Sequence, residues 1–159
     1  MIKITTLALS MALFVSGCTQ QPKKTESAFI VLKTPSMKYA DMGFISDHGS
    51  TVKIDIYAAG QPIVAWEINA VNVCVSALKC MSKKKFNEDF LTAAYPDTLL
   101  ENIFKSKAIF SEKNMEKTEN GFTQILKKDA AYDISYKVEK GKRTFRDSLN
   151  KILIKVREQ

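Results

Sequence analysis

Val52-Lys53-Ile54-Asp55-Ile56-Tyr57 is the stretch with the clearest structural signal, because apolar and polar side chains alternate along it. Successive side chains of a β-strand point to opposite faces of a sheet, so this period of two predicts a strand with one buried face. Turn-forming residues lie on both sides of it, at 47–50 and at 59–62. We therefore expect 52–57 to be a strand in an antiparallel sheet.

Shorter strand signals flank this stretch. Residues 28–32 form an apolar run rich in β-branched side chains that ends at Thr34-Pro35, and 42–46 resembles a second strand. Beyond the turn at 59–62, the run 63–68 with Trp66 at its centre continues the pattern, and 71–75 extends it. The first half of the chain thus predicts about five strands.

The period then changes from that of strands to that of helices. Asn87, followed by two acidic residues, predicts a helix that begins there and ends near Pro96, and Asp97 caps a second short helix. The apolar residues of the two helices cluster on one face of each, where they can cover a sheet. The residues expected to form this apolar lid are Phe90, Leu91, Leu100, Ile103 and Phe104.

Strand signals return after residue 108. Asn120-Gly121 is a strong hairpin turn between 114–118 and 122–127, and 132–138, 143–148 and 151–157 complete a tail of about four strands. No strand-helix-strand alternation appears, so the strands are expected to be antiparallel. The predicted fold is α+β, an antiparallel sheet or incomplete β-barrel covered by two short helices.

The N-terminus carries a different signal. Lys3 precedes an uncharged run at 4–15, and Val15-Ser16-Gly17-Cys18 ends the run with small residues before a cysteine. The uncharged run is too short for a membrane-spanning helix and is typical of a secretory signal peptide. These residues resemble the lipobox of bacterial lipoproteins. The alternative is an ordinary secretory signal that ends by chance at a cysteine.

The lipoprotein resemblance implies that the signal peptide 1–17 is removed and that Cys18 is acylated, which anchors the protein to a membrane. Thr19 stands where an aspartate would mark inner-membrane retention in enterobacteria, so the resemblance favours the outer membrane, with the inner membrane and the cell surface left open. Residues 18–26 are expected to be the acylated cysteine and a flexible tether, and 27–159 a single periplasmic domain.

The net charge and the cysteines limit the kinds of partner and site that we expect. The chain has 24 Lys and Arg against 17 Asp and Glu, and without Lys3 its balance is +6, which suits anionic membrane lipids. Nucleic acid is excluded, because an exported lipoprotein does not meet it and no recognition motif appears. Cys74 and Cys80 are expected to form a disulfide outside the cytoplasm, with two buried free thiols as the alternative.

No catalytic motif is found. His48, the only histidine, lies in a turn signal, and no nucleophile elbow or glycine-rich phosphate loop is present. A zinc site would need more ligands than the two cysteines. We therefore expect no enzyme activity, no cofactor and no metal. Lys83, Lys84 and Lys85 are the densest positive charge, either a basic contact surface or a solvated loop.

The order of elements suggests a second resemblance. Residues 42–68, 87–104 and 122–156 are similar in element order to the periplasmic lipoprotein carrier LolA and its outer-membrane receptor LolB, in which an incomplete antiparallel barrel with helical lids holds acyl chains. The resemblance implies a lipid or lipoprotein ligand and a role in outer-membrane biogenesis. No stretch is assigned to the receptor's protruding apolar loop.

The alternative function is a scaffolding lipoprotein that docks another envelope protein, for which an immunoglobulin-like sandwich would serve, although the helical stretch 87–107 counts against it. The two functions differ in the interior of the domain. A carrier needs an apolar cavity, whereas a scaffold can have a filled core.

Overall fold

The structure is a computed structural model that describes residues 23–159. The predicted signal peptide, the acylation site Cys18 and the first part of the tether fall on residues 1–22. These expectations lie outside the described residues.

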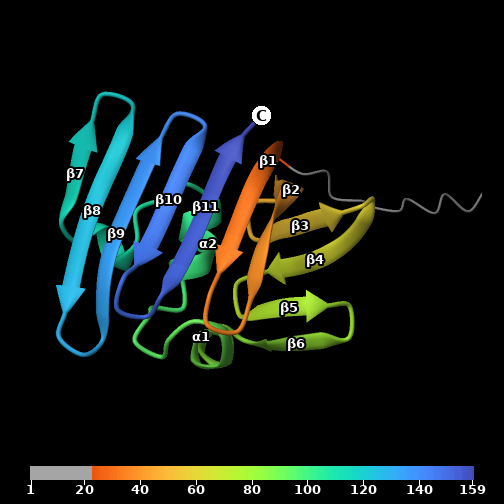
Figure 1. The fold of residues 1–159 in the computed structure, drawn as a ribbon, viewed down its shortest axis with the longest axis horizontal. Coiled ribbons are helices and arrows are strands. Elements are labelled where there is room, and N and C mark those ends of the chain that lie inside the picture. Colours follow the sequence, from red (N-terminus) through yellow and green to blue (C-terminus); the bar gives the residue numbers. More distant parts are fainter. Residues whose placement is uncertain (1–22) are drawn as a thin grey trace, which may run out of the picture.

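The described chain forms a single antiparallel sheet of eleven strands (Figure 1), which run in the order β6-β5-β4-β3-β2-β1-β11-β10-β9-β8-β7. Strands β6 and β7 lie at the two edges of this order, so the sheet is not closed. The strands are β1 (Lys24–Lys33), β2 (Lys38–Asp47), β3 (Val52–Ala58), β4 (Gln61–Ile68), β5 (Asn72–Ser76), β6 (Lys79–Ser82), β7 (Met115–Thr118), β8 (Gly121–Lys128), β9 (Tyr132–Glu139), β10 (Lys142–Asp147) and β11 (Ile152–Glu158).

The first and last strands join the two halves of the sheet. β1 pairs with β11 in antiparallel register, with Ile30 opposite Val156, while every other pair joins strands that follow one another in the chain. The sheet is therefore two meanders, β1–β6 and β7–β11, that share a seam at its centre (Figure 1).

The alternation in the sequence sets which face is buried. Val52, Ile54 and Ile56 of β3 are fully buried, whereas the residues between them are exposed or half-buried. The same pattern recurs in β9 and β11. We call the face with these buried side chains the inner face and the opposite one the outer face. The predicted antiparallel sheet with one buried face is confirmed.

The helices α1 (Lys83–Phe90) and α2 (Leu99–Phe104) and a short 3₁₀ turn (Phe110–Glu112) lie between β6 and β7, on the inner face (Figure 1). Helical residues are few, so the fold is mostly β and the α+β description overstates the helices. No helix among residues 23–159 is long and apolar enough to cross a membrane.

The predicted start of the first helix is wrong by about one turn. Ser82, at the end of β6, is the N-cap, and its side chain accepts a hydrogen bond from the backbone N–H of Lys85 at 3.1 Å. Asn87 lies inside the helix, where it is buried and donates to the carbonyl of Tyr95 at 3.3 Å. Ser82 satisfies the free N–H groups at the helix start, so the helix begins before Asn87.

Three features of the strands also differ from the prediction. β1 begins at Lys24, so residues 24–26 belong to the sheet and not to the tether. β6 was not predicted, because its four residues carry no alternating apolar pattern. The tail has five strands, β7–β11, at the five ranges expected there, so the expected count of about four was too low by one.

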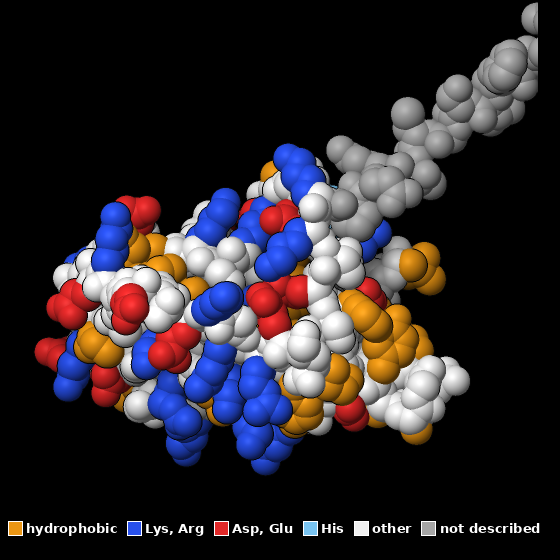
Figure 2. Space-filling view, turned by 90° about the horizontal axis from the view of Figure 1, so that it is seen from above, with side chains coloured by type: hydrophobic (Ala, Val, Ile, Leu, Met, Phe, Trp, Pro, Cys, Tyr) orange, Lys and Arg blue, Asp and Glu red, His pale blue; other side chains and the backbone are white. Residues whose placement is uncertain are grey.

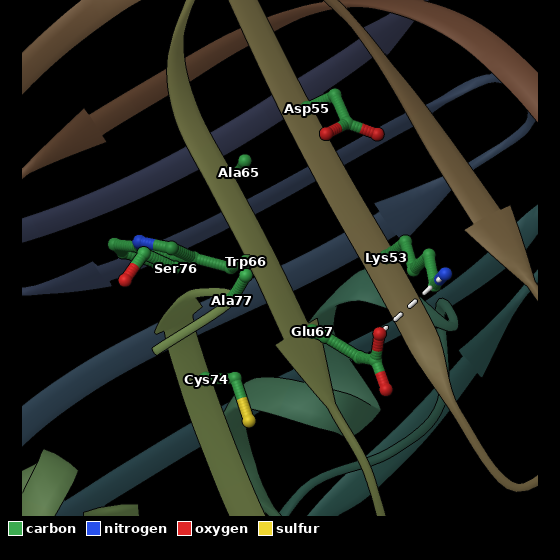
Figure 3. Close-up of a pocket in the computed structure, with 8 residues that line it drawn as sticks. All are labelled: Lys53, Asp55, Ala65, Trp66, Glu67, Cys74, Ser76 and Ala77. Carbon is green, nitrogen blue, oxygen red and sulfur yellow. Dashed lines mark ion pairs between the residues drawn. The ribbon is translucent and has the colours of Figure 1, made fainter. Parts of the chain in front are cut away.

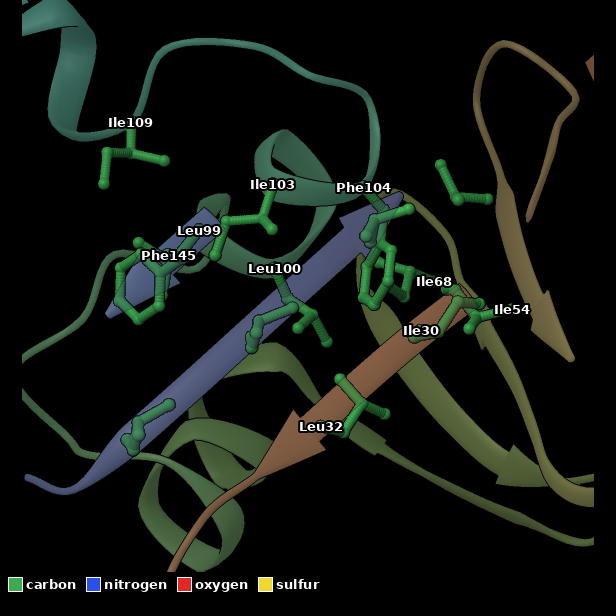
Figure 4. Packing of buried hydrophobic residues seen from close by; sticks show 14 of the residues in the cluster. Ile30, Leu32, Ile54, Ile68, Leu99, Leu100, Ile103, Phe104, Ile109 and Phe145 are labelled. Atoms are coloured by element: carbon green, nitrogen blue, oxygen red, sulfur yellow. The ribbon is translucent and has the colours of Figure 1, made fainter. Parts of the chain in front are cut away.

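One hydrophobic cluster fills the space between the inner face and the helices. Figure 4 shows Leu100 and Phe104 of α2 pointing toward Ile30 and Leu32 of β1, with Ile103 farther from β1 in the same cluster. All five of these side chains are at most 3% exposed. Burying such side chains stabilises the fold by about 1.5–3 kcal/mol each. The core thus extends from α2 to the central seam of the sheet.

Candidate functional site

An apolar groove opens at the edge of the inner face, beside α1. It has a volume of about 230 Å³, and its lining comes from the β1–β2 turn, β2, β4, β5 and the end of α1. Every lining residue is apolar or aromatic. They are Met37, Tyr39, Ile63, Val64, Trp66, Val75 and Phe90. A lining of this chemistry suits an alkyl chain better than a charged ligand.

Two β-bulges supply part of this lining. In the pairing of β3 with β4, Ile56 is opposite Val64 and Tyr57 is opposite Pro62, so Ile63 is an extra residue without a partner. In the pairing of β5 with β6, Val75 is the extra residue between Cys74 and Ser76. A bulge re-aims the side chain of the extra residue, which explains how these two residues join the groove.

The turn between β1 and β2 holds one wall of the groove in place. Thr34 is buried, and its hydroxyl accepts a hydrogen bond from the backbone N–H of Met37 at 3.1 Å. The backbone N–H of Thr34 in turn donates to the carbonyl of Met37 at 2.8 Å. This local closure fixes Met37 at the rim.

Aromatic contacts attach α1 to the groove. The ring of Trp66 packs edge-on against Phe86, with centroids 5.2 Å apart, and Phe86 lies 5.0 Å from Phe90. Phe86 is fully buried, whereas Phe90 is only partly buried. Because edge-to-face pairs add about 0.5–1.5 kcal/mol beyond burial, Phe86 anchors α1 while Phe90 reaches the groove.

The structure divides the five predicted lid residues into two groups. Phe90 lines the groove and Leu91 packs partly buried beside the core. Leu100, Ile103 and Phe104 are buried under the centre of the sheet and do not line the groove. The residues of α2 therefore fill the interior, and a single lid formed by both helices is not observed.

The predicted basic surface at residues 83–85 is wrong for Lys83, which is buried. Its Nζ donates to Oε2 of Glu101 at 2.9 Å, and Nζ of Lys105 donates to Oε1 of the same carboxylate at 2.7 Å. Lys85 pairs with Asp89 at 2.6 Å, and Lys84 is exposed. Lys83 serves as a link between α1 and α2.

Glu101 is the centre of this link. Burial disfavours its charged form, but the hydrogen bonds from Lys105 and Lys83 outweigh burial and lower the pKa of Glu101. Lys105 also donates to the carbonyl of Gly49 at 2.6 Å, in the turn between β2 and β3. One carboxylate thus joins both helices to the sheet.

A second polar link lies on the other side of the helices. Tyr95, between α1 and α2, donates its hydroxyl to Oδ2 of Asp147 in β10 at 2.6 Å. Oδ1 of Asp147 accepts from the backbone N–H groups of Asp133, Leu149 and Asn150. Burial opposes ionisation of Asp147, but these hydrogen bonds prevail and lower its pKa. Tyr95 therefore fixes the connection between the helices to β10.

A larger hollow of about 390 Å³ lies on the outer face, over β3, β4 and β5 (Figure 3). Lys53 and Glu67 form an ion pair at 3.5 Å on one side of it, and Asp55 lies on the same strand as Lys53. Burial raises the pKa of Asp55, and the nearby Lys53 acts in the opposite direction. Because charged groups surround it, this hollow suits an alkyl chain less well than the smaller groove does.

The predicted pair Cys74 and Cys80 is found at disulfide-bonding distance. The two residues lie opposite each other in β5 and β6, with Cα atoms 3.9 Å apart. The bond crosses the hairpin directly beside the bulge at Val75, so it holds together the strands that carry part of the groove.

The only histidine of the chain is found in a turn, as its sequence context predicts. His48 lies in the turn between β2 and β3, where its backbone N–H donates to the carbonyl of Thr51 at 2.8 Å. Within residues 23–159, no three His, Cys, Asp or Glu side chains are placed to hold a metal ion. Tyr39 carries the one hydroxyl among the groove's lining residues, and none of them is an acid, a histidine, a cysteine, a serine or a lysine.

Comparison with known proteins adds no assignment, since no family model matches the sequence and a search of curated proteins finds no match.

Proposed function

We propose that this protein is a non-enzymatic bacterial lipoprotein that is anchored through Cys18 to the outer membrane, faces the periplasm and binds an acyl chain of a lipid or of another lipoprotein. The observation that carries the proposal is the groove beside α1, whose seven lining residues are all apolar or aromatic. An alkyl chain gains about 0.8 kcal/mol for each methylene group that it buries there.

The size of the groove sets how much of a chain it takes. Pockets that bury a drug-sized ligand are about 300–1,000 Å³, and the groove is about 230 Å³. It therefore accommodates part of an acyl chain in the observed conformation. A longer segment requires the partly buried Phe90 to swing away from the groove while Phe86 keeps α1 on the core.

The resemblance to the lipoprotein carrier and receptor is consistent with this arrangement. An open antiparallel sheet with helices on its inner face has the arrangement of elements that the resemblance implies. Leu78, in the turn between β5 and β6, is an apolar side chain that is 98% exposed. Outer-membrane biogenesis is the process in which such a protein acts.

A scaffolding lipoprotein that docks an envelope protein is the second candidate. The specific observation in its favour is that Leu100, Ile103 and Phe104 fill the centre of the interior. On this alternative the groove is a surface depression and takes no ligand.

Titration with a fluorescent fatty acid separates the two. The protein is the mature chain with Cys18→Ser, and the test variant is Ile63→Asp, which places a charge in the groove at a residue that is 42% exposed. The control is Ile125→Asp, at a residue of the outer face that is 59% exposed.

The proposal expects saturable binding that phospholipid competes, that Ile63→Asp weakens at least tenfold and that Ile125→Asp leaves unchanged. If the folded protein shows no saturable binding, or if both variants lose fatty-acid affinity equally, the scaffolding function is favoured.

A further inference from the structure

A concentration of cations covers the outer face of the sheet around the central seam. In β10, Arg143, Phe145 and Asp147 are buried on the inner side, so the exposed Lys142 and Arg146 point outward. The same alternation places cations of the neighbouring strands on this side. We call the set the outer basic face, and its members are Lys33, Lys38, Lys127, Lys137, Lys142, Arg146, Lys155 and Arg157.

The strand register brings these cations into rows across the sheet. Arg157 of β11 lies opposite Lys142 of β10, and Lys155 lies opposite Thr144, which in turn faces Lys137 of β9. Neighbouring strands are about 4.8 Å apart, so these charges form a continuous surface. Figure 2 shows Lys and Arg side chains projecting together along the lower edge of the molecule.

Acidic residues compensate little of this charge. On the same strands, the outward-pointing acids are Asp133 and Glu139, and Glu139 pairs with Lys137 at 2.8 Å. Eight cations against two acids give the face a net charge of +6. A surface of this sign attracts a negatively charged partner.

Apolar side chains lie directly beside the cations. Met42 and Phe44 of β2 are 38% and 46% exposed on the outer face, and the ring of Phe44 contacts that of Tyr57 with centroids 6.1 Å apart. Phe29 of β1 lies opposite Met42 on one side and Arg157 on the other. Cations next to exposed aromatic side chains are typical of surfaces that meet the headgroup region of a bilayer.

The length of chain before β1 keeps this face near the membrane. Six residue steps separate Cys18 from Lys24, the first residue of β1, and such a segment spans at most about 20 Å. Arg157 pairs with Phe29, five residues further along β1. The closeness of the outer basic face to the membrane rests on the proposed acylation of Cys18, which would hold the domain within reach of the lipid headgroups.

We propose that the outer basic face docks on the anionic headgroups of the bilayer, so that the sheet lies with its outer face on the membrane. A folded acidic protein fits the face less well. Protein interfaces have a buried apolar centre, whereas here the cations are spread over six strands and the exposed apolar residues are divided between β2 (Met42, Phe44) and β8 (Ile125).

Co-sedimentation with lipid vesicles tests this docking. The protein is the mature chain with Cys18→Ser, which has no lipid anchor, and the vesicles contain either phosphatidylglycerol mixed with phosphatidylcholine or phosphatidylcholine alone. The test variant combines Arg146→Gln, Lys155→Gln and Arg157→Gln. The control makes the same change in charge outside the face, at the exposed residues Lys84, Lys107 and Lys117, each changed to Gln.

We expect binding to the anionic vesicles alone, with affinity that falls as salt is added. The test variant is expected to bind on the order of 100-fold more weakly, about fivefold for each charge removed. The control variant is expected to bind at least ten times more tightly than the test variant.

Equal binding to both vesicle types, or equal loss in the test and control variants, overturns the inference. Absence of binding to anionic vesicles also overturns it and leaves an acidic protein as the partner of this face. Ile63→Asp separates this result from the groove, because the inference predicts that this variant still sediments with anionic vesicles even if it no longer binds a fatty acid.

Discussion

The link between the two helices gives the sharpest test of the structure, through the substitution Glu101→Gln. The side chains of Lys83 and Lys105 are 6% and 5% exposed, and both donate to the carboxylate of Glu101. Glutamine keeps the shape of glutamate and can accept one hydrogen bond, but it removes the negative charge that the two buried ammonium groups share. The variant therefore takes from Lys83 its ion pair with Glu101 and leaves Lys105 with its longer contact to Asp47 at 3.9 Å.

The expected loss of unfolding free energy follows from the burial of these charged groups. Removing one partner of a buried ion pair costs about 3–5 kcal/mol. Glu101 is 19% exposed, so water relieves part of the cost and we expect the lower end, about 3 kcal/mol. For a chain of this size that loss lowers Tm by roughly 6–12 °C.

Urea and thermal unfolding, followed by circular dichroism, measure the effect. Asp89→Asn is the matched control, since it removes the charge of an exposed pair with Lys85, and its unfolding transition should not differ measurably from that of the parent. A loss below about 1 kcal/mol for Glu101→Gln would refute the reasoning, because it would mean that water already solvates both lysines.

Three further predictions concern the anchor, the disulfide and the dependence on pH. Cys18→Ser should release the protein from the membrane pellet on fractionation, since stable anchoring needs more than one acyl chain, and retention of the variant would exclude a lipid anchor. Thiol titration of denatured protein from the periplasm should find no free thiol at Cys74 and Cys80. The double serine variant should still fold and lose about 2 kcal/mol in urea unfolding, because the closed loop is short; failure to fold would contradict this. The pKa of Glu26 and of Asp147 is lower in the folded protein than in the unfolded chain, so their contribution to stability is present above their ordinary values near 4 and is lost as the pH falls through the folded pKa. The unfolding free energy should therefore decrease from pH 5 to pH 2, and a constant value over that range would contradict the assignment.

The sheet could be predicted from the sequence because its signal is local. Period-two alternation at 52–57, 132–138 and 151–157 fixes which side chains are buried before any partner strand is known, and these strands are confirmed. The pairing of β1 with β11 could not be predicted in the same way. It joins residues at opposite ends of the chain, and no local pattern specifies it.

The groove could be predicted only in part, because some of its residues enter it through strand pairing that no local pattern specifies. Phe90 was expected to reach the interior because of its place on an amphipathic helix. Ile63 and Val75 enter the groove through bulges, which depend on how two strands pair and not on the sequence of either strand alone. The positive charge of Lys83 can be read from the sequence. Its ion-pair partner cannot, because Glu101 lies 18 residues away on another helix.

The first residues of β1 were assigned to the tether because a distant contact, and not their own sequence, places them in the sheet. Lys24, Thr25 and Glu26 look like solvated tether when they are taken alone. In the fold, Arg143 forms a buried ion pair with Glu26, and burial of Glu26 is outweighed by this pair, which lowers the pKa of its carboxyl. A contact between residues 26 and 143 therefore extends the strand into a segment whose own composition favours coil.

Quenching of Trp66 fluorescence by a brominated fatty acid is the most direct measurement of acyl binding in the groove. Trp66 is the only tryptophan of the chain and lines the groove, and bromine quenches an indole only when the two are in close contact. We predict saturable quenching of the mature chain with Cys18→Ser, reversed by unlabelled phospholipid and weakened by Ile63→Asp. Fluorescence of the folded protein that stays unchanged through the titration, or quenching that never saturates, would contradict acyl binding in the groove.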